Sequence, residues 1–225
     1  MDSRDQVLQL CAIFAPFVIG VALLNTTVHL FPNVPDHIRA ISPLLPAEFV
    51  RSKPDLDNLF GAPGSAIRRA VLERNASHPM DVLAFWGLFS AASALAMAAI
   101  RPKLRKLGIV LIVTSAAFLF LRVQVLDLTA GAANAAVFTD EAAQNIYRLA
   151  RLQWSLMFLN TLFGSLLFLG SAPEVRSAAY LSIISAILGM IGIALYTPLI
   201  PYAALGIFFA VSGVALFCFF KPEMV

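Results

Sequence analysis

Residues 107–128 have the sequence LGIVLIVTSAAFLFLRVQVLDL, in which only Arg122 and Asp127 are charged. A helix needs about 20 mostly apolar residues to cross the roughly 30 Å of hydrocarbon in a bilayer, and this stretch is long enough. Five more stretches have the same character: 7–31, 80–100, 149–170, 177–197 and 199–220. Backbone groups in a bilayer must hydrogen-bond to one another, and no alternating strand pattern is present, so we expect helices. The predicted fold is an all-α, polytopic integral membrane bundle of about six transmembrane helices, forming a single domain over residues 1–225.

The composition of the chain excludes several other classes of protein. Of its 225 residues, 60% are hydrophobic and 13% are charged, whereas soluble proteins have about half apolar and a quarter charged residues. An ordinary soluble domain, a disordered chain, collagen and a coiled coil are thereby excluded. The Lys and Arg residues behind the net charge of +3 lie between the apolar stretches, which indicates membrane topology and not a nucleic-acid surface. Cys11 and Cys218 lie in apolar stretches without a CxxC motif, which excludes zinc ribbons and thioredoxin-like redox sites.

One long connection is predicted, at residues 32–79 between the first two helices, and it contains seven of the 13 prolines. Within it, PAEFVRS at residues 46–52 is expected to form a short helix. A second helix is expected to start at Ser65, with Ile67 and Val71 on one face. This second helix is amphipathic and basic, a pattern typical of a helix in the headgroup region of a bilayer, while a solvated loop helix stays open as the alternative.

The short connections predict how the chain turns and how it is oriented. Only residues around Pro198 separate the last two spans, which predicts a tight antiparallel hairpin. Residues 101–106, RPKLRK, form the densest group of cations in the chain. Positive loops stay in the cytoplasm, and an even number of helices places both termini on the side of this group. We therefore expect a multi-pass protein with both termini cytoplasmic, although the cations of loop 32–79 act against this orientation.

Polar residues gather at one end of the predicted bundle. The first four helices carry them where alternating topology places the helix ends beside loop 32–79, whereas the last two helices contribute almost none. They are Asn25, His29, Asp81, Arg122, Gln124, Asp127, Arg151, Gln153 and Asn160. Asn25 and His29 share one helix face, and Gln153 and Asn160 share another. Ionisable groups in membrane spans are costly and are functional candidates by default, so we expect a polar pocket that opens toward this side.

These residue types suit proton transfer on a lipid-soluble molecule. A carboxyl group in a medium of low dielectric has a raised pKa and acts as a general acid near neutral pH. We therefore expect Asp127 and Asp81 to be catalytic, with His29 as a third candidate. Arg, Gln and Asn side chains position water or stabilise negative charge, and the expected substrate-binding residues are Asn25, Arg122, Gln124, Arg151, Gln153 and Asn160. The expected reaction is an isomerisation, a cyclisation or an epoxide-opening hydrolysis of a terpenoid, sterol-like or polyketide substrate.

A structural role is the alternative for the same residues. Arg122 and Asp127 would then form ion pairs across helices with Asp81 or Arg151, and Asn160 would hydrogen-bond a neighbouring helix. Under this interpretation the protein is a non-catalytic membrane subunit, an assembly factor or a lipid-binding protein. Small residues in the second and fifth spans would let it pack against a partner helix, so a homo- or hetero-oligomer is left open.

Metal and cofactor chemistry has little support in the sequence. Three histidines are too few for a di-iron cluster, and they cannot supply paired haem ligands on facing helices. No HExxH, GxSxG or P-loop motif occurs. We therefore expect no metal and no cofactor. The expected partners are the lipid bilayer and a hydrophobic small molecule, and no nucleic acid. A carrier or channel ranks last, because the chain has no inverted repeat.

Overall fold

The computed structural model describes residues 31, 33–41, 46–77, 105–171 and 176–200, together with residues 202–203, 206–207 and 209–210. These residues form six α-helices and one 3-10 helix, and no strand occurs among them. The expected all-α class is therefore confirmed for the described part of the chain. Two predicted spans lie outside the described residues: 80–100, and 7–31 apart from residue 31. Residues 211–220 of the sixth span also lie outside them.

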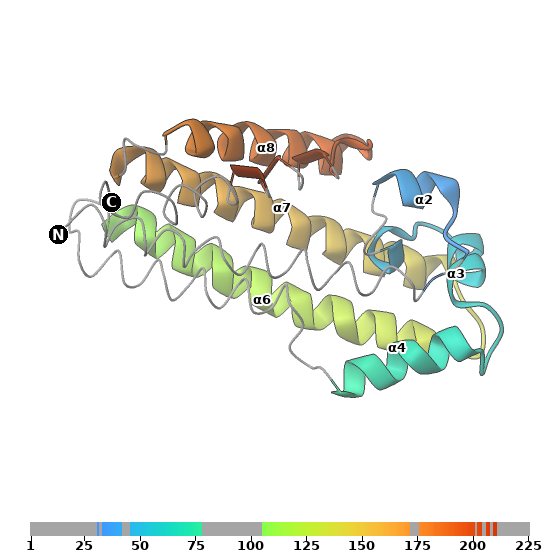
Figure 1. Ribbon diagram of the computed structural model, residues 1–225. Helices are drawn as coiled ribbons and strands as arrows, with labels where there is room; N and C mark the ends of the chain where they lie inside the picture. The colour runs from blue at the N-terminus through green and yellow to red at the C-terminus, as the bar shows by residue number, and fades with distance from the viewer. Residues whose placement is uncertain are drawn as a thin grey trace.

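Three long helices form the body of the molecule: α6 (Arg105–Asn134), α7 (Asp140–Ser171) and α8 (Arg176–Leu195). Helix α7 lies between α6 and α8 and packs along both of them (Figure 1). Helices α6 and α8 are long and apolar enough to cross a membrane, judged by length and composition. These two helices support the membrane class that the sequence predicts.

Helices α6 and α7 extend beyond the spans predicted for them at 107–128 and 149–170. Helix α6 continues to Asn134 because the residues after the apolar stretch include several alanines, which favour helix. Helix α7 begins much earlier than its apolar part, with Asp140 in its first turn. The hydroxyl of Thr139 accepts a hydrogen bond from the Ala142 N–H at 3.1 Å and so caps the helix start. Hydrophobicity marks the span, whereas a cap and an acidic first turn mark the start of the helix.

Helix α8 ends in a sharp reversal of the chain. Tyr196 has a φ of 52°, and the Thr197 N–H donates to the Gly192 carbonyl at 3.0 Å. The following residues pack back on α8, and a Cβ placed on Gly206 would lie 2.1 Å from Ser185 Oγ. The side chains buried in this segment recur at helical spacing: Ile200, Ala203, Ile207 and Ala210. The turn expected between spans 177–197 and 199–220 is therefore present.

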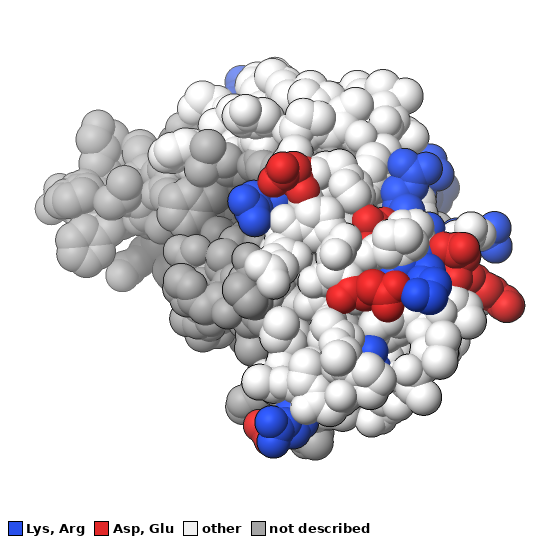
Figure 2. Space-filling view, turned by 90° about the vertical axis from the view of Figure 1, so that its right-hand side faces the viewer, with Lys and Arg blue, Asp and Glu red and all other residues white. Residues whose placement is uncertain are grey.

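The long connection folds into a layer over one end of α6 and α7, and its described residues, 33–77 apart from residues 42–45, are called the cap below. The cap contains α2 (Asp36–Ile41), the 3-10 helix η2 (Pro46–Phe49), α3 (Lys53–Phe60) and α4 (Ala66–Ser77). It lies where α6 ends and α7 begins (Figure 1). Charged side chains gather on this end of the molecule, which Figure 2 shows face on. Beneath them the cap buries apolar side chains, including Ile38, Phe49, Leu56, Leu59 and Phe60.

Two helices of the cap differ from their predicted form. The helix expected at 46–52 is only the short η2, because Ser52 starts a new helix as its N-cap. Ser52 and Asp55 form a capping box, in which each side chain accepts from the backbone N–H of the other. Helix α4 begins close to the expected start. It packs on α6, and its Val71 is buried. Of the apolar face expected to contact lipid headgroups, Val71 is therefore buried in protein, whereas Ile67 is only half-buried.

Candidate functional site

A charged pair is buried where the cap meets α6 and α7. Glu48 of η2 is 4% exposed and forms an ion pair with Arg122 of α6, which is 2% exposed. The second carboxylate oxygen, Glu48 Oε2, accepts a hydrogen bond from Trp154 Nε1 at 2.6 Å. Arg122 Nη1 also donates to Gln153 Oε1 at 3.4 Å. These four residues, called the buried polar centre below, join three distant parts of the chain.

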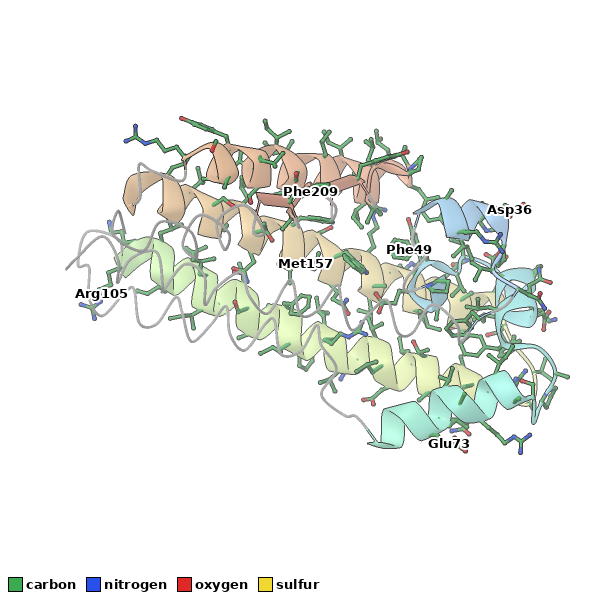
Figure 3. All side chains as sticks on the ribbon, viewed as in Figure 1. Asp36, Phe49, Glu73, Arg105, Met157 and Phe209 are labelled. Carbon is green, nitrogen blue, oxygen red and sulfur yellow. The ribbon has the colours of Figure 1, made fainter. Side chains whose placement is uncertain are left out.

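Local features of each segment explain why these side chains point inward. On α6, Arg122 lies seven residues after Ser115, and both belong to the buried face of the helix. On α7, Gln153 and Trp154 are adjacent and both are buried. All four residues of η2 are buried, and the ring of Phe49 lies 6.2 Å from that of Trp154. Figure 3 shows Phe49 beside α7. Glu48 is therefore buried together with its apolar neighbours in η2.

Gln153 carries a hydrogen-bond donor that no described residue satisfies. The residue is 0% exposed, and its Nε2 atom has no partner within the described part of the chain. The orientation of the amide is fixed, because a guanidinium has only donors and the amide oxygen must therefore face Arg122. Leaving such a donor unsatisfied in the interior costs about 1–3 kcal/mol. Stability alone therefore does not explain this side chain.

The cap is held on the long helices by contacts next to Glu48. The guanidinium of Arg51 lies over two aromatic rings, 5.6 Å from the centroid of Tyr147 and 4.6 Å from that of Tyr196. The Tyr196 hydroxyl donates to the Phe49 carbonyl at 2.9 Å. These contacts fix η2, and with it Glu48, against α7 and the end of α8.

Tyr196→Phe is expected to lower the free energy of unfolding by about 0.5–1.5 kcal/mol, because the ring stays in place and only the hydrogen bond to the Phe49 carbonyl is lost. The measurement is reversible chemical unfolding in detergent micelles. Tyr202→Phe is the matched control, since Tyr202 is 67% exposed and its substitution should change the value by no more than about 0.5 kcal/mol. Equal effects of the two substitutions would show that Tyr196 does not anchor the cap.

Arg68 of α4 anchors the other side of the cap. Its Nε and Nη2 atoms donate to the Gly61 carbonyl at 3.2 and 2.9 Å, and its Nη1 atom donates to the Ala135 carbonyl at 2.5 Å. The guanidinium also lies 4.1 Å from the ring centroid of Phe138. Arg68 is buried, and these acceptors are backbone carbonyls. It therefore ties the connection between α3 and α4 to the turn between α6 and α7.

Asn160 forms a separate polar contact on α7, seven residues after Gln153 and thus about 10 Å further along the helix. Its Nδ2 atom donates to Ser115 Oγ at 2.8 Å. Its Oδ1 atom accepts from Thr114 Oγ1 at 3.3 Å. Both partners belong to α6, so Asn160 joins α6 to α7 in the way that the structural alternative predicts.

The structure brings two of the expected site residues together. Arg122 and Gln153 lie in the buried polar centre, and the ion-pair partner of Arg122 is Glu48. Asp127, expected to be the catalytic acid, is exposed on α6. Asp127 lies five residues after Arg122, which places the two side chains on different faces of the helix. Asp127 is therefore not part of the buried polar centre.

The other expected site residues lie elsewhere or outside the described residues. Gln124 is half-buried on α6. Arg151 is exposed, and its Nη2 atom donates to the Ala194 carbonyl of α8 at 3.3 Å. Three expected residues lie outside the described residues: Asn25, His29 and Asp81.

Glu48 is not among the expected site residues, because it lies in the long connection and not in a predicted span. A signal was nevertheless present in the segment LLPAEFV at residues 44–50, where Glu48 is the only charged residue among apolar neighbours. When such a segment is buried, its carboxylate is buried with it and needs a partner.

The described residues contain no group of three or more His, Cys, Asp or Glu side chains that could hold a metal ion. No family of known proteins, no curated protein and no solved structure matches this chain. Any function must therefore be argued from the geometry of the buried polar centre.

Proposed function

We propose that this protein is a small multi-pass membrane enzyme that transfers a proton to or from a hydrophobic small molecule, with Glu48 as the acid/base. The observation that carries the proposal is the buried ion pair between Glu48 and Arg122. Removing two charges from water is costly, and apolar residues of similar volume are often as stable or more stable in their place. Charges retained in the interior of a membrane bundle are therefore functional candidates by default.

The neighbours of Glu48 suit this role. In a site of low dielectric, a carboxylate removes a proton from the substrate and returns it at another atom. Arg122 and Gln153 carry donors that stabilise negative charge as it develops on a substrate oxygen. Such groups support isomerisation, cyclisation or epoxide opening of a terpenoid, sterol-like or polyketide molecule. Glu48 thus takes the place that the sequence assigned to Asp127.

The surface supports a bundle that crosses the membrane with the cap in water. The cap end is charged (Figure 2), and its exposed residues include Asp36, Arg39 and Asp57. The sides of the long helices instead expose large apolar side chains: Val113, Phe120 and Val123 on α6, and Ile184, Ile187 and Leu195 on α8. We extend the proposal to six spans, with both termini in the cytoplasm and the cap on the opposite side.

A non-catalytic membrane subunit, assembly factor or lipid-binding protein is the second candidate. It is favoured because both carboxylate oxygens of Glu48 already have partners and because Asn160 serves to join helices. In such a protein the buried polar centre would only fix the cap, and the exposed apolar faces of α6 and α8 would bind another membrane protein.

Glu48→Gln separates the two candidates. The substitution preserves the shape of the side chain but removes the carboxylate that exchanges a proton. The protein in micelles is incubated in D2O with a total lipid extract of the cells that produce it, and products with new carbon–deuterium bonds are found by mass spectrometry. We expect such products with the unsubstituted protein and at least about 100-fold less with Glu48→Gln.

Asp127→Asn is the matched control, since it also neutralises one acid of the polar end but at an exposed position of α6. It should leave the yield of deuterated product unchanged. Loss of product with Asp127→Asn but not with Glu48→Gln would restore Asp127 as the acid. No product from the unsubstituted protein, together with a stoichiometric partner that co-purifies in mild detergent, would contradict the enzyme and favour the subunit.

A further inference from the structure

The amide nitrogen of Gln153 lies in the interior with no hydrogen-bond partner among the described residues. The amide oxygen accepts from Arg122 Nη1 at 3.4 Å, so the nitrogen is directed away from that guanidinium. Two N–H bonds are therefore available for an acceptor that the described chain does not provide. Arg122 Nη1, which donates to the Gln153 amide oxygen, also pairs with Glu48, so the Gln153 amide and the proposed acid/base are joined through one guanidinium.

A carbonyl oxygen is the acceptor that fits this place best. Three of the four side chains in the buried polar centre carry N–H donors: Arg122, Gln153 and Trp154. The acceptors of the group are already engaged, because both oxygens of Glu48 and the amide oxygen of Gln153 accept hydrogen bonds. A hydroxyl group would bring a proton that also needs an acceptor, whereas a carbonyl accepts without donating. The chemistry of the centre therefore favours a ketone over an alcohol.

We propose that Gln153 Nε2 binds the carbonyl oxygen of a lipid-soluble ketone or enone. This inference rests on the proposed function, because a carbonyl group makes the neighbouring C–H bond acidic enough for a carboxylate to break. The proton forms an O–H bond on Glu48, and the electron pair moves to the carbonyl oxygen as an enolate. Gln153 donates to that oxygen and stabilises its charge. With an enone the enolate is conjugated to the double bond, so return of the proton from Glu48 to a different carbon moves that double bond, and the reaction is an isomerisation that needs no second reactant.

The test uses the full chain in detergent micelles and 2-decalone labelled with ¹³C at its carbonyl. A hydrogen bond lowers the carbonyl stretching frequency, so an infrared difference spectrum reports the contact directly. We expect a lowered band with the unsubstituted protein and no such band with Gln153→Met, together with about tenfold weaker binding of the ketone. Decalin has the same skeleton without oxygen, and it should bind both proteins equally.

Two further variants keep the result interpretable. Gln153→Met should unfold at about the same temperature as the unsubstituted protein when no ligand is present, because removal of the unsatisfied donor offsets the loss of the amide oxygen that accepts from Arg122. Gln153→Leu has no hydrogen-bond donor either and differs from methionine in shape, so it should also lose the lowered band. An unshifted band with the unsubstituted protein, or a lowered band that survives in both Gln153 variants, overturns the inference.

Glu48→Gln distinguishes this inference from the proposed function. It leaves the Gln153 amide in place, so the lowered carbonyl band should persist while deuterium transfer stops. A lowered band without deuterium transfer in the unsubstituted protein would support the carbonyl site and contradict the acid/base role of Glu48. Deuterium transfer without a lowered band would support the role of Glu48 and contradict the carbonyl site.

Discussion

Arg122→Leu is expected to lower the free energy of unfolding by about 3–5 kcal/mol, since it leaves the carboxylate of Glu48 buried without its cationic partner. Arg122 is the largest of the fully buried side chains in the described part of the protein, and leucine also leaves part of its volume empty. The Trp154 indole still donates to Glu48, but one neutral donor does not replace an ion pair. Reversible chemical unfolding in micelles, followed by circular dichroism, measures the loss.

The double substitution Glu48→Leu with Arg122→Leu should recover most of that loss, to within about 1–2 kcal/mol of the unsubstituted protein. An apolar pair has no charge to desolvate. The free-energy costs of the two single substitutions therefore do not add up in the double variant. The exposed pair of Lys53 and Asp57 is the control, and Lys53→Ala should cost no more than about 1 kcal/mol. A loss below about 1 kcal/mol in Arg122→Leu would show that Glu48 and Arg122 do not act as a buried unit.

This double variant also bears on why the charges are present. If it folds as well as the unsubstituted protein yet forms no deuterated product, the ion pair serves chemistry and not stability. If it folds well and still binds a stoichiometric partner, the subunit interpretation gains instead. Stability and function are therefore measured on the same protein, which removes unfolding as an explanation for lost activity.

The long helices could be predicted from the sequence because a run of apolar residues is enough to specify them. Helices α6 and α8 correspond to such runs. The cap could not be predicted in the same way, since its conformation depends on contacts that no periodic pattern contains. The Ser52–Asp55 capping box is local, but Arg68 reaches a carbonyl 67 residues away at Ala135. Contacts of that kind are fixed by tertiary packing and not by local propensity.

The candidate site was predictable in part. Arg122 and Gln153 stand out as polar residues in apolar helices, and both belong to the buried polar centre. Asp127 stands out equally, yet it is exposed. A helix that is apolar on all sides gives no sign of which face meets the next helix, so the sequence could not distinguish Arg122 from Asp127. Glu48 escaped prediction because its partner is 74 residues away on another element.

Gly189→Ala is expected to destabilise the protein by about 1–3 kcal/mol, although alanine is the better helix former. A Cβ on Gly189 of α8 would lie 2.4–2.5 Å from three ring atoms of Phe158 on α7. Phe158 is 0% exposed, so its ring has little room to move. Gly131→Ala is the matched control, because a Cβ there meets nothing within 4 Å and the substitution should stabilise α6 by about 0.5–1 kcal/mol. The two substitutions should therefore have opposite signs in the same unfolding measurement.

The substitution Gly189→Ala is also expected to affect the buried polar centre, because Phe158 packs against Trp154. The ring of Phe158 lies 6.1 Å from that of Trp154, whose indole donates to Glu48. A ring displaced by a new Cβ would press on Trp154, so Gly189→Ala should also change the Trp fluorescence of the folded protein. Replacing Phe158 with Leu in the same variant should relieve the clash and cost less than the sum of the two single substitutions. Additive losses of unfolding free energy would mean that α7 and α8 separate without moving Trp154. The packing of these two helices would then not be coupled to the position of Glu48.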